Sequence, residues 1–539
     1  MTPGAERVDV LVTPLCPVHV GAGEDFDPTG YVIDDGVLYH FDPAALPLDA
    51  ADRQALLAAV SQRGDEAILA VQRFFHERSA GCKGVARQAL PVAAGIEAQY
   101  RERIGKTAQR ETGGRRVANR LEIERTSHHP HTGMAYLPGS SLKGAMRTAW
   151  LDRINGGRPR HPSEHAQAME LRLLDGGAFP TDPLRLLAVS DAAGTRVGSQ
   201  VFFSTNHRKQ YVGKDGEELP RKGPPVRREC LTPAQYGALA CALSVDPMAG
   251  VHRAGSTPAP QRRVKGWQDL AQACNRYYRP RLERELTLLD ERRFASPDWL
   301  LGMRSLLAAL APALESGQAL LLRVGRHSGA ENVTLDGVRQ ISIKKKGRGQ
   351  PAEWSDVGAT TVWLAAEYEN DRSGMQPFGW LLLHRAGQTL PALQAWCTAQ
   401  PGPDLEALAD VLDRARQQAR EHAASASAAE AERAAQAARA AQAAEQEALR
   451  LLALSEHGRA VEALRTLLLA HTAARRQPVG GQLYQEVRKL LVQAAQAAWS
   501  DVDRLSLADV LRTLVPEKIE LGGKAKEIKQ AAARLSGSA

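Results

Sequence analysis

This chain is divided by one segment that cannot form a hydrophobic core of its own. Residues 404–454 consist almost entirely of Ala, Glu, Arg and Gln, which are strong helix formers. The apolar face of such a helix is mostly alanine, so each turn buries little apolar area. The cores of the 539-residue chain therefore have to lie before and after it. We predict a helical linker at residues 401–454; a long helix packed on a partner is the alternative.

Strand and helix patterns follow one another before this linker. Alternating or wholly apolar runs predict strands at residues 8–14, 31–41, 121–126, 186–194, 201–205, 319–324, 341–345, 361–366 and 379–384. Helical spacing predicts helices at residues 50–78, 142–154, 233–243, 268–289 and 297–314. This succession is typical of an α+β sandwich. After the linker, leucine-faced segments at residues 460–470, 483–499 and 506–514 predict a small helical bundle.

The charge of the chain favours a polyanionic partner. The formal net charge is +8 and the isoelectric point is near 9.2. Residues 401–539 carry 19 basic and 18 acidic residues, so nearly all of the excess lies in the first 400 residues. We therefore place any nucleic-acid surface in the first 400 residues.

The cysteines and the N-terminus bear on the cellular compartment. The six cysteines include no C-x-x-C pair, which argues against a zinc ribbon and a secreted disulfide scaffold. There is no apolar signal-peptide core and no stretch of about 18 apolar residues that could span a membrane. We expect a soluble, cytoplasmic protein without a cofactor.

The stretch Pro138-Gly-Ser-Ser-Leu-Lys-Gly-Ala-Met-Arg147 predicts a helix start that binds an anion. Ser140 or Ser141 is placed to cap the first turn. Free backbone N–H groups and the positive dipole end then face outward. Lys143 and Arg147, four residues apart, add charge to one face. The stretch is not a P-loop, because the order G-x-x-x-x-G-K-[ST] is missing.

The motif at residues 138–147 resembles the signature of the RAMP superfamily, the ferredoxin-like RNA-binding subunits of CRISPR effector complexes. Three further stretches are similar to the Csm-type cap subunit of type III-A complexes: residues 13–42, 322–334 and 377–383. The resemblance implies two ferredoxin-like, RRM-related domains with insertions, at residues 1–184 (with a basic insertion near 100–133) and 185–400. An all-α extension at 455–539 follows the linker, and the resemblance does not reach it.

The resemblance also implies a function. Such a subunit is non-catalytic, caps one end of the ribonucleoprotein filament in antiviral defence, holds the 3′ part of the guide RNA and docks on the adjacent backbone subunit. Its expected partners are guide RNA, target RNA, that backbone subunit and the small helical subunit of the complex, with no membrane.

Glycine-rich loops and basic side chains are the candidate RNA contacts. Gly325-Arg-His-Ser-Gly329 offers backbone N–H groups beside basic residues, which suits a phosphate. The full set of expected contacts is His19, Gly21, Gly23, Arg115, Arg116, Gly139, Ser140, Ser141, Lys143, Arg147, Gly325, Arg326, His327, Ser328, Gly329, Lys344 and Lys345. Aromatic residues make up only 5% of the chain, which argues against a base-stacking platform and favours a sequence-independent grip on the backbone.

Two catalytic readings stay open. His19 could act as general acid–base in a metal-independent RNase that processes guide RNA, although packing under the glycine turn is its simpler role. Asp27 or Asp34, in an acidic cluster with Asp25 and Asp35, could serve a metal-dependent target RNase, whereas such residues also favour turns. His128, His129 and His131 lack the spacing and the cysteine partner of a tetrahedral site, so we predict no metal there.

Overall fold

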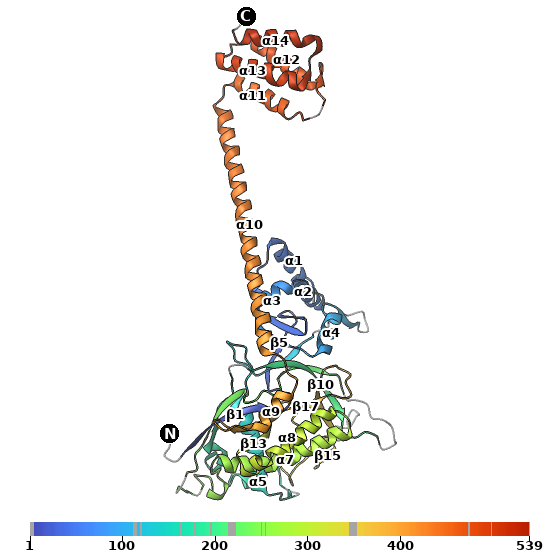
Figure 1. Cartoon of the computed structure of the whole chain (residues 1–539), viewed down its shortest axis with the longest axis vertical. Helices are drawn as coiled ribbons and strands as arrows, with labels where there is room; N and C mark the ends of the chain where they lie inside the picture. The colour runs from blue at the N-terminus through green and yellow to red at the C-terminus, as the bar shows by residue number, and fades with distance from the viewer. Residues whose placement is uncertain are drawn as a thin grey trace. The chain divides into compact units, whose positions relative to one another are not determined.

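The computed structural model describes residues 5–110, 116–118, 121–161, 164–176, 179–194, 197–213, 223–248, 251–253, 255–343, 353–472, 475–496 and 498–537, with the backbone alone for residues 107–110, 116–118 and 166. The chain divides into two compact units, residues 1–423 and 424–539. The first contains both large sheets and the second is helical (Figure 1). A mixed α+β fold with a helical C-terminal part, as predicted, is confirmed.

A five-stranded sheet, here sheet A, forms the centre of the first unit. Its strand order is β13 (Ala319–Arg323), β18 (Trp380–Arg385), β1 (Glu6–Pro14), β12 (Leu239–Val245) and β9 (Leu187–Val189). Every neighbouring pair is antiparallel, with Val12 opposite both Leu239 and Leu383. Val10 and Val12 are fully buried, so the alternation that predicted β1 places these side chains in the core.

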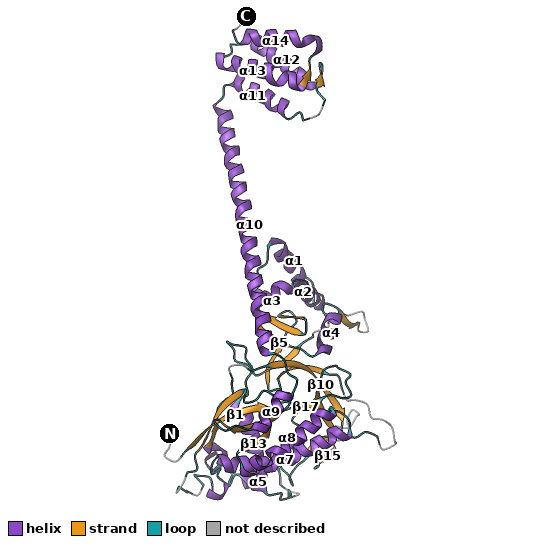
Figure 2. Cartoon of the chain, in the orientation of Figure 1, coloured by secondary structure: helices purple, strands orange, loops and turns teal. Residues whose placement is uncertain are grey.

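Helices cover sheet A and contribute to one continuous core. They are α5 (Gly139–Asn155), α7 (Trp267–Glu291), α8 (Pro297–Ser316) and α9 (Pro391–Ala399). Asn275 of α7 joins helix to sheet, because its amide donates to the carbonyls of Leu314 and Ala319 and accepts from the N–H of Leu321. Figure 2 shows α5, α7 and α8 grouped in this unit.

A second sheet, sheet B, has the order β17 (Gln376–Pro377), β16 (Thr361–Ala366), β10 (Ser199–Arg208), β11 (Val226–Leu231), β8 (Ile123–Thr126) and β2 (Gly21–Phe26). Both sheets take strands from either side of residue 185, the expected domain boundary. A boundary there does not separate one sheet from the other.

A small lobe of the same unit has its own core. Three strands, β3 (Tyr31–Asp34), β4 (Val37–Phe41) and β5 (Ala86–Pro91), pack with α1 (Ala50–Val60), α2 (Asp65–Glu77) and α3 (Ser79–Gly84). Helix α4 (Ala94–Arg103) contributes its buried residues to the large core instead. The expected hairpin turn at Asp34–Gly36 is present, with Asp35 at a φ of 50° and Gly36 at 72°.

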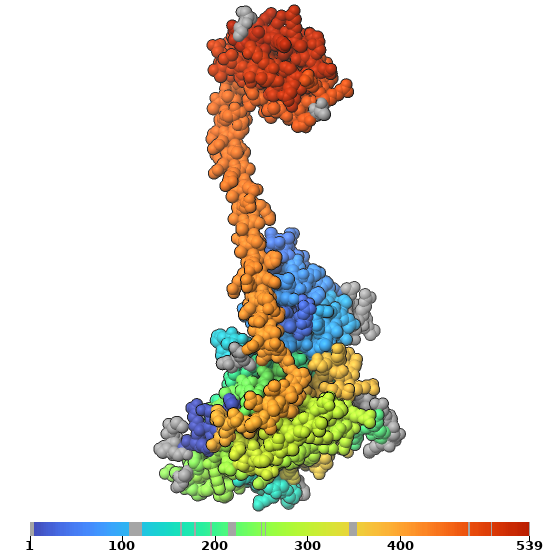
Figure 3. Space-filling model, in the orientation of Figure 1, coloured from blue at the N-terminus to red at the C-terminus, as the bar shows by residue number. Residues whose placement is uncertain are grey.

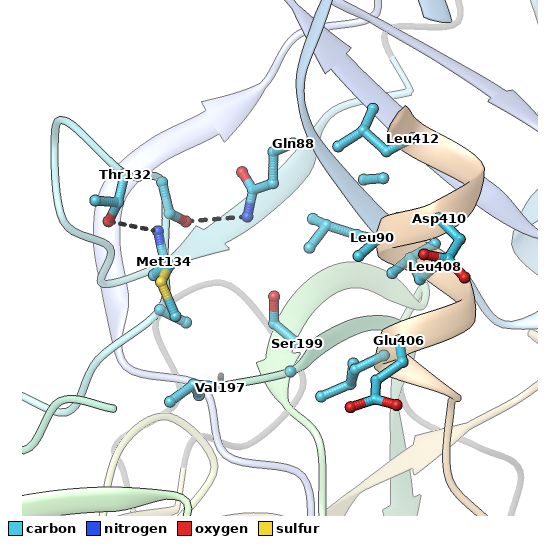
Figure 4. Close-up of a pocket in the computed structure, with 16 residues that line it drawn as sticks. Gln88, Leu90, Thr132, Met134, Val197, Ser199, Glu406, Leu408, Asp410 and Leu412 are labelled. Atoms are coloured by element: carbon cyan, nitrogen blue, oxygen red, sulfur yellow. Dashed lines mark hydrogen bonds between the residues drawn. The ribbon is translucent and has the colours of Figure 1, made fainter. Parts of the chain in front are cut away.

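The long helix α10 (Leu405–Ala453) begins against this lobe (Figure 3). Val411 and Leu412 join the lobe's core, and the Arg416 guanidinium donates to the Ala86 carbonyl at 2.9 Å. These first turns also wall a cavity of about 570 Å³ with Gln88 of β5, Met134 and Ser199 (Figure 4). No residue of α10 is fully buried, as expected for a face made of alanine.

Residues 424–539 form a second core on leucine-faced helices. These are α11 (Glu456–Leu469), α12 (Gln482–Gln496), α13 (Asp501–Lys518) and α14 (Ala525–Leu535), with a short pair β19 (Gln477–Pro478) and β20 (Ile519–Glu520). Ser455 and Ser500 cap α11 and α13, and both hydroxyls donate to Asp503.

The remaining elements are short. They are β6 (Thr107–Arg110), β7 (Arg116–Ala118), α6 (Ala166–Leu173), β14 (Ile341–Ile343), β15 (Glu353–Ser355) and 3-10 turns at Pro43–Ala45, Phe179–Thr181, Pro183–Leu186, Pro260–Arg262, Ala330–Asn332 and Gly522–Lys524. Among the described helices, none combines the length and the apolar character needed to cross a membrane.

The helix predicted at residues 233–243 is wrong. The chain turns at residues 233–238 and then forms β12. Leu239, Cys241, Leu243 and Val245 are buried in alternation, which is the period of a strand. Pairing with β1 and β9 on both sides decided between helix and strand.

Candidate nucleic-acid interface

Three predicted contact segments lie at one end of sheet A. Strands β13 and β9 each run antiparallel to a strand that is itself antiparallel to β1. Therefore β1, β9 and β13 point the same way, and their carboxyl ends share one edge. The segment that leads to Gly21 follows β1, and the Gly325–Gly329 loop follows β13. Asp191, after β9, accepts a hydrogen bond from the N–H of Gly139 at the start of α5 (2.7 Å).

The segment after β1 and the Gly325–Gly329 loop touch through their backbones. The N–H of Arg326 donates to the His19 carbonyl at 2.8 Å. Gly325 has a φ of 79°, and a Cβ there would lie 2.2 Å from the same carbonyl oxygen. Only glycine fits this approach. Arg326 itself is exposed, which leaves its guanidinium open to solvent beside the joined loops.

His19 is a buried structural histidine in this arrangement. Its side chain is 1% exposed, and Nδ1 donates to the Glu229 carbonyl at 2.7 Å. Burial lowers the pKa of His19 to about 4, so the ring is neutral at neutral pH. A Cβ on Gly21 would lie 3.3 Å from Nε2 of His19. The ring therefore packs under the glycine turn, which agrees with the simpler of its two sequence-based roles.

A buried carboxyl lies beneath the same turn. Glu229 of β11 is fully buried, and it accepts hydrogen bonds from the Ser199 hydroxyl (2.8 Å) and the Thr126 N–H (3.2 Å). Burial raises its pKa to about 7. The guanidinium of Arg125 lies 4.0 Å away and over the ring of Phe26.

Arg228, the preceding residue of β11, is held by an acidic partner of its own. Its side chain is 4% exposed and makes two hydrogen bonds to Glu124, at 2.9 and 2.8 Å. Such a paired geometry fixes the guanidinium plane.

His327 lies inside the glycine loop with its ring against aromatic side chains. It stacks on Trp363 with ring centroids 4.3 Å apart and also contacts Phe378. Burial lowers the pKa of His327 to about 2. Ser328 is also buried, and its hydroxyl donates to the Gly325 carbonyl. These two side chains therefore shape the loop, and the exposed parts of the loop are Gly325 and Arg326.

The start of α5 differs in detail from the expected cap. Pro138 is the N-cap residue of α5, and it makes no side-chain cap hydrogen bond. Asp191 instead accepts from Gly139, whose missing Cβ lets the helix start lie against the backbone of Val189 and Ser190. The expectation that Ser140 or Ser141 caps the helix is therefore wrong. Ser140 is exposed, and Ser141 and Lys143 are half-buried.

Arg147 lies two turns into α5, and acidic partners already hold it. Its guanidinium pairs with Asp182 at 2.6 Å and with Glu170 at 3.7 Å. The expected basic face is thus partly neutralised at this position.

The acidic cluster is built from turn and ion-pair residues. Asp27 accepts from both the N–H and the hydroxyl of Thr29, an Asx turn. Asp34 pairs with Lys83 and, at 3.7 Å, with Arg101. Among the described residues, no group of three or more His, Cys, Asp or Glu side chains is arranged to hold a metal ion.

The histidines at 128, 129 and 131 also have local partners. Nδ1 of His128 bonds the Thr126 carbonyl, and its Nε2 lies 3.5 Å from Glu24. Nδ1 of His129 accepts from the N–H groups of residues 131 and 132.

All of the RNA contacts remain predictions, and four of the residues cannot be placed by their side chains. Arg115, Lys344 and Lys345 lie outside the described residues, and Arg116 is described by its backbone alone, in β7.

The buried charged residues of β11 were not predicted from the sequence. Residues 208–228 are basic and rich in Gly and Pro, which favours a loop, whereas Arg228 and Glu229 belong to β11 and are buried. The run Val-Arg-Arg-Glu-Cys-Leu at 226–231 ends in apolar residues. Two adjacent residues of opposite charge next to such an apolar end are the sequence signal that could have indicated the buried strand.

These features define a class of protein, namely a mixed α+β unit in which glycine-rich loops meet at one end of a central sheet. Residues 11–256 match the model of the RAMP superfamily. This match, over 246 of the 539 residues, agrees with the family resemblance.

Solved structures give weaker likenesses. One is a chain of a Csm–crRNA–target RNA ternary complex from a type III-A CRISPR–Cas system, with a TM-score of 0.41 and 18% identity over 70% of this chain and 100% of that chain. Another is T. onnurineus Csm5, with a TM-score of 0.38 and 16% identity over 69% of this chain and 99% of that chain. No curated protein sequence matches this chain.

Proposed function

We propose that this protein is a non-catalytic RNA-binding and assembly subunit that caps a type III-A CRISPR ribonucleoprotein filament in antiviral defence. It holds the 3′ part of the guide RNA and docks on the adjacent backbone subunit. The observation that carries the proposal is the meeting of three motif segments at one end of sheet A. The RAMP match over residues 11–256 supports it.

The order of four strands in sheet A supports a ferredoxin-like unit. In chain order β1, α5, β9, β12, α7 and β18 follow the β-α-β-β-α-β pattern, and the strands lie in the order β18, β1, β12, β9. Strand β13 and helix α8 are additions at one edge. The resemblance implies a second unit of this kind, and our proposal assigns it to sheet B.

The chemistry of the joined loops favours backbone recognition. Exposed glycines at positions 21, 23 and 325 let a phosphate approach main-chain N–H groups closely. Arg326 and Lys143 supply positive charge without reading a base. Binding of this type is independent of sequence and weakens steeply with salt.

The geometry also favours a non-catalytic role. His19 is buried and neutral, so it is poorly placed to exchange a proton with an RNA hydroxyl. Asp27 and Asp34 are engaged in a turn and in ion pairs. Residues 424–539, whose charge is balanced, are proposed to contact protein partners, the backbone subunit or the small helical subunit of the complex.

A binding experiment tests the proposal. The full-length chain is mixed with end-labelled repeat–spacer guide RNA over a salt series, and complexes are separated on native gels. The double variant Lys143→Glu with Arg326→Glu should lose the shift. The control Arg276→Glu changes an exposed arginine of α7 that is not among the predicted contacts, and it should bind like the natural protein.

The same mixtures run on denaturing gels test the enzymatic alternatives. Intact RNA with EDTA and with magnesium agrees with the proposal. Cleavage that resists EDTA and disappears in His19→Ala would establish the metal-independent RNase. Cleavage that needs magnesium would point to Asp27 or Asp34. Equal binding by the double variant and the natural chain would refute the assigned surface.

A further inference from the structure

A small basic cavity lies next to the Gly325–Gly329 loop and outside the surface assigned above. Its volume is about 220 Å³. The lining comes from α7, from both sides of the glycine loop, from the end of β10 and from the segment before β16: Lys209, Arg281, Arg284, Glu285, Leu288, Arg323, Glu331, Asn332, Arg339, Val357, Gly358 and Ala359.

Positive charge exceeds negative charge in this lining. Five residues carry a positive charge and two carry a carboxylate. Arg323 pairs with Glu285 at 2.9 Å, and Lys209 pairs with Glu331. Arg281 and Arg339 share a single carboxylate oxygen of Asp336. The cavity therefore keeps a cationic excess that an anion would neutralise.

The guanidinium groups are held in place before any ligand arrives. Arg323 and Arg281 are 3% and 6% exposed. Arg281 donates to the carbonyls of Tyr277 (2.6 Å) and Glu331 (3.2 Å), and lies over the Tyr277 ring at 3.4 Å. Fixed donors of this kind lose little conformational freedom when they bind an anion.

Arg284 differs from the other arginines. It is exposed, and its Nε donates a hydrogen bond to the backbone carbonyl of Pro280 at 3.2 Å. Its guanidinium is therefore the group in the lining that an entering anion can recruit most easily. Substitution at this exposed helix position should leave the fold intact.

We propose that this cavity binds a phosphate group. Guanidinium groups match phosphate oxygens in charge and geometry. Pockets for drug-sized ligands begin at about 300 Å³, so this smaller cavity suits a phosphate better than a nucleobase. The phosphate belongs either to an RNA end or to a free phosphorylated small molecule. The inference does not require guide-RNA binding at the joined loops, because inorganic phosphate itself is the first probe.

The test uses the full-length chain at low salt, with binding followed by calorimetry. The probes are inorganic phosphate, adenosine monophosphate, and a short oligoadenylate that carries either a terminal phosphate or a hydroxyl. Arg284→Glu is compared with Arg276→Glu, which makes the same charge change on the same helix outside the cavity lining. Loss of one charged contact should weaken phosphate binding about tenfold or more in Arg284→Glu.

Each result decides the inference. Saturable phosphate binding that falls in Arg284→Glu and not in Arg276→Glu supports it. Tighter binding of the phosphate-ended RNA than of its hydroxyl counterpart, lost in Arg284→Glu, assigns an RNA end. Equal or tighter binding of the free nucleotide assigns a small molecule. Absence of phosphate binding at millimolar concentration, or an equal loss in both variants, overturns the proposal. RNA binding that is lost only in the Lys143/Arg326 variant leaves it unaffected.

Discussion

Replacing Gly325 with alanine should separate the two loops that meet at the end of sheet A. Gly23 provides a matched control, because its φ is also 79°. A Cβ on Gly23 would have no neighbour within 4 Å, whereas a Cβ on Gly325 would lie 2.2 Å from the His19 carbonyl oxygen. The two substitutions therefore share the same backbone strain and differ in the contact between the loops.

The magnitudes follow from these distances. Alanine in the left-handed region costs about 1–2 kcal/mol, and the reduced entropy of the unfolded chain offsets about 0.4–1 kcal/mol of this. Gly23→Ala should thus lower the free energy of unfolding by about 1 kcal/mol. Gly325→Ala adds about 1–3 kcal/mol of steric overlap and weakens the hydrogen bond from Arg326 to His19, worth about 1 kcal/mol. We expect a total loss of about 3 kcal/mol.

Urea unfolding followed by tryptophan fluorescence measures both values. Every tryptophan except Trp499 lies in residues 1–423, and Trp363 stacks on His327 in the affected loop. Native gels with guide RNA provide the second readout, in which Gly325→Ala should bind more weakly than the natural chain. Equal losses of stability in the two variants would refute the close contact between the loops.

Three further predictions concern the surroundings of this site. Glu229→Gln should change the pH dependence of stability. Burial raises the pKa of Glu229 in the folded state to about 7 from 4.5, so the folded state binds the proton more tightly than the unfolded state. The contribution of Glu229 to stability should therefore grow as the pH falls from about 7 to 4.5, and it should vanish in the variant. Denaturation midpoints measured across this range would contradict the burial of Glu229 if both proteins gave the same profile. Glu124→Gln should destabilise the first unit by about 2 kcal/mol, because Arg228 is left buried with a weaker partner; urea unfolding beside the exposed control Glu122→Gln checks this value. Truncation after residue 423 should leave the thermal unfolding of the first unit unchanged, whereas truncation after residue 403 should lower its midpoint, because it removes the turns of α10 that complete the small lobe.

Local patterns were sufficient for much of the fold. Alternation in residues 8–14 predicted β1, and the Asp-Asp-Gly turn predicted the hairpin of β3 and β4. The composition of residues 404–454 predicted α10 and its lack of buried side chains. These features depend on residues close in sequence, for which periodicity and turn chemistry are decisive.

The sequence motifs likewise located the loops of the candidate site. Glycines at 139 and 325 stand where two pieces of backbone come close, and no larger residue fits there, whereas a Cβ on Gly21 would meet the His19 ring. The sequence alone did not separate residues that contact solvent from those that shape the loops. His19, His327 and Ser328 carry polar groups typical of RNA contacts, but His19 and Ser328 are buried and His327 is half-buried against Trp363, as the packing around them decides.

What the sequence determined by itself was therefore most of the strands and helices, the long helix of residues 404–454 and the motif segments that resemble the RAMP signature. The tertiary structure decided which strands share a sheet, since long-range pairing joins residues 6–14 to 239–245 and 380–385. It also turned the expected helix at 233–243 into a strand, and it placed Asp182 beside Arg147 and Glu124 beside Arg228. Such pairings join residues far apart along the chain, and no local period encodes them.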